Sequence, residues 1–228
     1  MWREPSCAVG VSSCRHVPMI RWADVPSGGN LPASLLRDRL RGATAREHAA
    51  LDALVTPPHL ETPSGYRAFL QASARALVPL ELSLEAAGVS GWLPDWPSRA
   101  RRHALQRDLL DLGIVDPIRP VLDVPPARDF SVGVLYVLEG SRLGGRVLSR
   151  QVRAADAQAP VAYLTHGLEQ NLWRSFLIWL DSSAKVDFRT DAVEAGARYG
   201  FRCFSQAFES LVPPTGGLNV RGCAHVWV

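Results

Sequence analysis

Apolar residues recur along most of the chain at the three- and four-residue spacing of an amphipathic helix. The first such stretch covers residues 32–55, where Pro32 suits a first turn and Pro57-Pro58 stops the helix. Its apolar face also contains two polar residues, Thr44 and His48. The same spacing predicts further helices over 64–87, 98–112, 129–153, 163–182 and 190–212.

The stretch 129–153 fits two periods at once. From Phe130 to Leu138 the apolar residues alternate as in a strand, but the same run also satisfies helical spacing. The pattern continues to Val152, which is longer than a strand, so its length favours a helix. Because no hairpin signal and no βαβ alternation occur, we predict an all-α, multi-helix bundle.

The composition adds a domain outline to this pattern. With 228 residues and 47% hydrophobic residues, the chain is long enough for one substantial core. We expect an irregular N-terminal arm over 1–30, a helical domain over 31–212 and a C-terminal tail over 213–228. This composition excludes a disordered polyelectrolyte, a collagen-like chain and a disulfide-rich miniprotein.

The charge is weakly basic, at +3, and does not by itself predict nucleic-acid binding, which needs a clustered basic surface. Lys185 is the only lysine, so the basic residues are almost all arginines. Coding bias explains such a choice, and so does anion recognition, because arginine holds carboxylates in a rigid fork. Four scattered cysteines and the lack of a signal peptide or membrane span predict a cytoplasmic protein.

His48 is the first candidate for chemistry. A lone histidine on an apolar face is most often a core residue, but it can also be a metal or heme-iron ligand. A ligand needs a neutral ring nitrogen in an apolar cavity and an acceptor for its other N–H, which Asp52 could supply. Arg41 precedes His48 by seven residues, so the two share a face about 10 Å apart along the axis. That is roughly the span from a heme iron to its propionates.

Gly140, Gly144 and Gly145 are the second candidate, because each glycine inside a helix costs about 1 kcal/mol relative to alanine. A phosphate loop would explain them, but neither nucleotide-binding motif is present. Close helix packing through Gly140-x-x-x-Gly144 would also explain them. In a third interpretation the bare backbone lies over a flat ligand, with the Ser141 hydroxyl at its edge.

Arginines beside aromatic residues form the third candidate. Arg174 follows Trp173, and Arg198 lies three residues before Phe201. Such arginines commonly lie at the surface, where their stems cover apolar area. Alone, neither residue predicts a ligand.

Taken together, these segments resemble the heme oxygenase family over about residues 33–211. The stretch from Leu40 to His48 resembles the proximal helix of that family, and Tyr136 to Gly145 resembles its glycine-rich distal helix. Ala197-Arg198-Tyr199-Gly200-Phe201 is similar to part of its last core helix. The form E-G-S-x-L-G-G is most similar to bacterial members, including those associated with bacteriophytochromes.

The resemblance implies roles for these residues. It implies that His48 ligates the heme iron, that Thr44 belongs to the proximal motif, and that Phe201 is an aromatic of the heme pocket. It places Arg41, Arg174 and less firmly Arg198 near the heme propionates. Gly140, Gly144 and Gly145 would line the distal side, and Ser141 replaces the distal aspartate of animal-type members.

The resemblance also implies a reaction. The family cleaves heme with dioxygen to biliverdin, iron and carbon monoxide, using electrons from an external donor such as a ferredoxin or a reductase. A bacteriophytochrome is a further candidate partner, as acceptor of the biliverdin. Two alternatives remain open: a heme-binding or heme-handling protein without turnover, and a helical enzyme for another small molecule.

Overall fold

Helices make up the regular structure of the chain. A computed structural model describes residues 35–55, 60–115, 127–183 and 188–210, and no strand occurs among them. The predicted arm at 1–30 and tail at 213–228 lie outside these residues. The all-α prediction is confirmed, and the ambiguous stretch at 129–153 is helical.

The predicted helix over 32–55 is two helices, α1 (Leu35–Ala43) and α2 (Ala45–Leu54). They meet at Thr44, whose hydroxyl donates to the carbonyl oxygen of Leu40 at 2.8 Å. Such a bond from threonine to the preceding turn bends a helix. Backbone hydrogen bonds still cross the junction, from Thr44 to Leu40 O and from His48 to Thr44 O. The prediction of one continuous helix was therefore wrong at Thr44, although α2 continues from α1.

The second predicted helix is confirmed as α4 (Pro63–Ala86), which continues through Pro79. Its N-cap is Thr62, two residues before the predicted start, because the Thr62 side chain accepts from the Gly65 N–H at 3.1 Å. Pro63 then takes the first helical position. Gly88 follows the helix with φ +75°, a left-handed conformation that favours glycine.

The stretch after Gly88 contains two short helices, η2 (Val89–Gly91) and α5 (Trp96–Arg99), where a loop was expected. The next predicted helix is the shorter α6 (Arg102–Asp111). The stretch 129–153 splits at Ser141 into α7 (Arg128–Gly140) and α8 (Arg142–Ala155), beside the predicted glycines.

The predicted helix over 163–182 is also divided, into α9 (Ala162–Thr165) and α10 (Leu172–Ser183). The segment between them contains two left-handed residues, Gly167 with φ 72° and Asn171 with φ 48°. The last predicted helix is confirmed as α11 (Thr190–Glu209).

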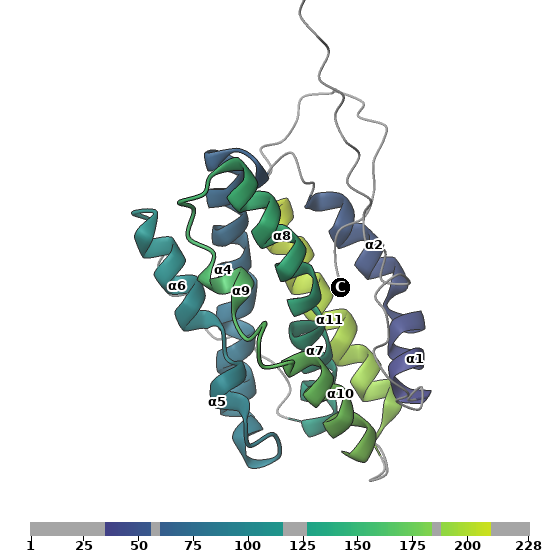
Figure 1. The fold of residues 1–228 in the computed structure, drawn as a ribbon. Coiled ribbons are helices and arrows are strands. Elements are labelled where there is room, and N and C mark those ends of the chain that lie inside the picture. The colour runs from purple at the N-terminus through teal and green to yellow at the C-terminus, as the bar shows by residue number, and fades with distance from the viewer. Residues whose placement is uncertain (1–34, 56–59, 116–126, 184–187, 211–228) are drawn as a thin grey trace, which may run out of the picture.

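Among the described helices, α7 and α11 pack against each other most extensively. Helix α11 also packs on α4 and α2 (Figure 1). In Figure 1, α1 and α2 run along one side and α4 and α6 along the other, with α7, α8 and α11 between them. Two glycines permit the α7–α11 contact, because a Cβ on Gly133 would lie 1.9 Å from Val193 O and one on Gly196 would lie 2.0 Å from Phe130 O. None of the described helices combines the length and apolar character needed to cross a membrane.

Candidate functional site

A cavity lies between the helix of His48 and the glycine-rich segment. Residues from α2, α4, α7, α11 and the α7–α8 junction line it. They are Leu51, Ser73, Val137, Ser141, Phe201, Phe204 and Phe208. Because the lining is aromatic and aliphatic except for two hydroxyls, it suits an apolar ligand with few polar contacts.

His48 lies beside this cavity, with a fifth of its side chain exposed. Its Nδ1 lies 3.1 Å from Oδ2 of Asp52, one turn along α2, and the Asp52 side chain is 5% exposed. This contact favours the tautomer in which Nδ1–H donates to the carboxylate and Nε2 is unprotonated. The His48 ring also meets the Phe201 ring edge-on, with centroids 5.8 Å apart.

This donor set fits a heme iron. A neutral imidazole whose other nitrogen is oriented by a carboxylate is the usual histidine arrangement at a metal. An apolar wall beside the ring, here Phe201, suits the macrocycle of heme. No group of three or more His, Cys, Asp and Glu side chains among the described residues could hold a bare metal ion.

Across the cavity, Gly140 and Gly144 are both buried. Gly145 has a packing reason to be glycine, because a Cβ there would lie 2.4 Å from the carbonyl oxygen of Leu164. That direction leads towards α9, so we assign Gly145 to the α8–α9 contact and do not retain it as a ligand residue. Close packing, one of the three interpretations of the glycines, therefore applies to Gly145.

The predicted arginines are exposed and lie on three helices. Arg41 ends α1, and its charge acts on the buried hydroxyl of Tyr136. Arg198 on α11 reaches Oε1 of Glu47 on α2 at 3.5 Å, so it lies on the side of His48. Arg174 on α10 follows Trp173, whose ring packs against Tyr136 with centroids 5.8 Å apart. The structure thus links Arg198 to α2 and the charge of Arg41 to Tyr136, whereas beside Arg174 it is Trp173 that contacts Tyr136.

Thr44 and Ser141 have their hydroxyls in defined hydrogen bonds. Thr44 is buried, and its hydroxyl is taken by Leu40 O, so the side chain shapes the α1–α2 junction. Ser141 is buried at the α7–α8 junction and lines the cavity. Its Oγ accepts a hydrogen bond from Nη2 of Arg101 at 2.7 Å.

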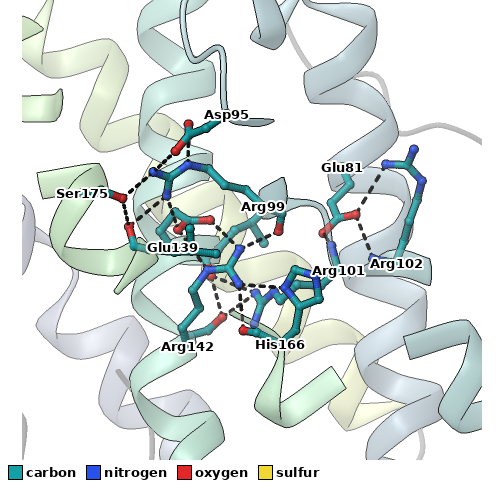
Figure 2. A network of polar contacts seen from close by, with 12 residues as sticks. Glu81, Asp95, Arg99, Arg101, Arg102, Glu139, Arg142, His166 and Ser175 are labelled. Atoms are coloured by element: carbon teal, nitrogen blue, oxygen red, sulfur yellow. Dashed lines mark hydrogen bonds and ion pairs between the residues drawn. The ribbon is translucent and has the colours of Figure 1, made fainter. Parts of the chain in front are cut away.

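Behind Ser141 lies a network of buried charges that the sequence pattern did not indicate (Figure 2). The carboxylate of Glu139 accepts from Nη1 of Arg99 at 2.7 Å and from Nη2 of Arg142 at 2.8 Å. All three side chains are 6% exposed or less. Arg99 also binds Asp95, and Arg142 also donates to the carbonyl oxygens of Arg99 and His166. These bonds hold the α7–α8 junction to α5 and to His166, which directly follows α9.

Two titratable groups beside this network have shifted pKa values. Burial, followed by the charge of Arg142, lowers the pKa of His166 from 6.5 to about 4, so this histidine is neutral at pH 7. Burial also raises the pKa of Glu81, whose carboxylate nevertheless accepts from the backbone N–H groups of Arg101 and Arg102. The only sequence signal for this network is the i, i+3 spacing of Glu139 and Arg142, which on its own also describes an exposed pair.

Two comparisons identify similar proteins. The chain is 33% identical over 138 residues to a heme oxygenase of Xanthomonas campestris pv. campestris, a match that spans 55% of this chain and 81% of that protein. The fold is similar to the crystal structure of NO- and CO-bound heme oxygenase from Neisseria meningitidis, with a TM-score of 0.65 and 23% identity over 77% of this chain and 91% of the other. No family model matches the chain.

Proposed function

Since the chain belongs to the heme oxygenase family, we propose that heme binds between α2 and α7, with Nε2 of His48 as the ligand of its iron. The protein is a heme-degrading oxygenase, with biliverdin, iron and carbon monoxide as the products of the family. The observation that carries the proposed site is the Asp52–His48–Phe201 arrangement beside the cavity. It supplies one oriented imidazole at an apolar wall.

Heme supplies both the iron at which dioxygen is reduced and the macrocycle that is oxidised, so the protein contributes binding, orientation and electrostatics. Asp52 holds the Nδ1 proton of His48, which keeps Nε2 available as a ligand. Phe201, Phe204 and Phe208 give this part of the cavity an apolar lining. At Gly140 and Gly144 the absence of side chains lets backbone approach a flat ligand closely.

We assign the propionate carboxylates to exposed arginines. Arg198 is the strongest candidate, because its bond to Glu47 places it beside the helix of His48. That bond is 3.5 Å long and lies at the surface, so it is weak, and a propionate can replace the Glu47 carboxylate. Arg41 and Arg174 are proposed as further partners from the resemblance.

The histidine assignment has a direct test. Replacing His48 by alanine should remove the proximal histidine signature from the optical spectrum of the ferric heme complex and abolish turnover with ascorbate. His103→Ala is the matched control, because His103 lies exposed on α6. An unchanged Soret band and unchanged turnover in the His48→Ala protein would contradict the assignment. In the native protein, loss of the Soret band with the appearance of biliverdin distinguishes the enzyme from a protein that binds heme without turnover.

We further propose that electrons come from an acidic donor protein such as a ferredoxin or a reductase. The exposed arginines of α1, α2 and α11 support this proposal, since Arg39, Arg46 and Arg198 all lie on the side of His48. Turnover with ferredoxin should fall as ionic strength rises, whereas turnover with ascorbate should change little. Equal salt dependence with both donors would contradict the proposal.

A bacteriophytochrome is proposed as acceptor of the biliverdin, because the sequence Glu139-Gly140-Ser141 followed by Leu143-Gly144-Gly145 resembles members associated with those photoreceptors. Adding bacteriophytochrome apoprotein to a turnover reaction should produce its red-absorbing form. If biliverdin accumulates free while the apoprotein stays colourless, this pairing is wrong.

A further inference from the structure

Five aromatic side chains away from the cavity form a continuous row of ring contacts, which we call the aromatic row. Trp173, Phe176 and Trp179 lie on one face of α10, because they are spaced three residues apart. The ring centroids of Trp173 and Phe176 are 5.9 Å apart, and those of Phe176 and Trp179 are 5.6 Å apart. At one end Trp173 meets the ring of Tyr136 at 5.8 Å, and at the other end Trp179 meets that of Trp92 at 5.7 Å.

The inner end of the aromatic row lies at the proposed heme site. Tyr136 is 2% exposed and precedes Gly140 by four residues, so the two share a face of α7. That is the face on which we propose that a flat ligand approaches the backbone. Burial raises the pKa of Tyr136 to about 12, so its phenol keeps its proton at neutral pH. A phenol gives up an electron readily only as its proton leaves, so the Tyr136 ring is a bridge from the site to Trp173.

The outer end of the aromatic row is closer to solvent. Trp92 is partly buried, and the guanidinium of Arg128 lies over its ring, 5.7 Å from the centroid. This cation disfavours a positive charge on the indole, so an oxidised Trp92 loses its Nε1 proton to solvent and becomes a neutral radical. The Nε1–H of Trp179 instead donates to the carbonyl oxygen of Trp92 at 2.9 Å. A carbonyl is too weak a base to take that proton, so an oxidised Trp179 stays a cation that draws an electron from Trp92.

The choice of residues in the aromatic row suits electron transfer. Three of the four tryptophans in the described part of the chain belong to it. Indole rings lose single electrons more readily than phenyl rings do. Phe176, which is fully buried, fills the space between Trp173 and Trp179. Packing alone also favours ring contacts, but it does not require a readily oxidised ring on each side of this phenyl group.

The oxidant is hydrogen peroxide, the two-electron reduction product of the dioxygen that is reduced at the heme iron. We propose that the aromatic row carries single electrons from Trp92 to the heme site, so that peroxide formed there is reduced to water. Each peroxide takes up two electrons and two protons and yields two waters. The protons come from solvent, and a soluble one-electron reductant such as ascorbate replaces both electrons at Trp92. This inference rests on the proposed function, because it requires heme in the site.

The first test uses the native full chain, treated with hydrogen peroxide without a reductant and analysed by peptide mass spectrometry. The electrons then come from the aromatic row itself, and the Trp92 radical adds dioxygen to give an oxygenated indole. Oxidation at Trp92 should require bound heme and should disappear when ascorbate is present, because ascorbate replaces the lost electrons. Equal oxidation of Trp92 in the heme-free protein would show direct attack from solvent and would overturn the proposal.

The order of the aromatic row gives a second test, in heme-loaded variants. Trp173→Phe should abolish oxidation at both Trp179 and Trp92, whereas Trp179→Phe should abolish it at Trp92 alone. Trp96→Phe is the matched control, because Trp96 has no ring contact among the described residues and its Nε1–H donates to Glu85. This control should leave the pattern of oxidation unchanged. Heme-dependent oxidation of Trp92 that persists in Trp179→Phe with a native Soret band would overturn the proposal.

Failure of this inference can be distinguished from failure of the proposed function. If heme added to the native chain gives no Soret band, both are wrong. If the native chain binds heme and forms biliverdin, but peroxide causes no heme-dependent oxidation at Trp92, the aromatic row does not conduct electrons and the proposed function stands.

Discussion

The α7–α11 contact makes the sharpest stability prediction, because one substitution should have opposite effects at two glycines. Gly133 and Gly42 both lie within helices, but a Cβ on Gly42 meets nothing within 4 Å, whereas one on Gly133 would lie 1.9 Å from Val193 O. Gly42→Ala should therefore stabilise the protein by about 0.5–1 kcal/mol, the difference in helix propensity.

Gly133→Ala cannot be accommodated without moving a helix. Real Cβ atoms essentially never come closer than 3.0 Å to another heavy atom, so the backbones of α7 and α11 must separate by at least roughly 1 Å at this point. A gap of that size loses a quarter to a half of the dispersion energy of the atoms that face it. With the usual cost of overpacking, we expect a net loss of about 2–4 kcal/mol, even after the gain in helix propensity.

Urea unfolding, followed by circular dichroism, would measure the free energy of unfolding of both variants. The effect should also reach the site, because α7 ends at Ser141 and α11 carries Phe201. A displacement of about 1 Å in α7 should reduce turnover by more than the stability loss explains, since misplacement on that scale can cost about 100-fold in rate. If Gly133→Ala is as stable as the native protein, the two helices do not approach as closely as described.

Two further predictions concern the buried network. Glu139→Gln removes the negative charge between Arg99 and Arg142, so it should lower the free energy of unfolding by about 3–5 kcal/mol; a loss below about 1 kcal/mol in urea unfolding would show that the charges are not desolvated. The depressed pKa of His166, about 4 against 6.5 when unfolded, means that the unfolded chain takes up a proton first as pH falls. Stability should therefore drop between pH 6.5 and about 4, and His166→Gln should flatten that part of the profile; identical profiles for the two proteins would contradict it.

Local spacing was enough to locate most helices but not their breaks. The apolar stripe of residues 32–55 continues across Thr44, so periodicity cannot detect the bend that its hydroxyl introduces. The break between α9 and α10 is set by Gly167 and Asn171 in left-handed conformations. A stripe of apolar residues on either side of such a break still resembles one helix, because the pattern records burial and not backbone direction.

The histidine and its motif were predictable, because His48 and Asp52 lie one turn apart on one helix. The burial of three arginines was not predictable. Arg99, Arg101 and Arg142 are buried, although a run of basic residues usually indicates an exposed helix face. Several of their hydrogen-bond partners are 37 to 76 residues away in sequence, so only the folded chain brings these groups together. Ser73 was also missed, because nothing in the sequence of α4 distinguishes it from other small residues.

The position of α11 has a consequence for how the protein acquires heme. Both walls of the proposed site, α2 and α7, pack on this last helix, which begins at Thr190 and also supplies Phe201 and Phe204. During synthesis the N-terminal helices leave the ribosome first, so His48 is exposed to solvent long before its aromatic neighbours exist. The site is complete only after α11 has been synthesised. A chain that ends before Thr190 would have the proposed iron ligand but no Phe201 or Phe204 to hold the macrocycle against it.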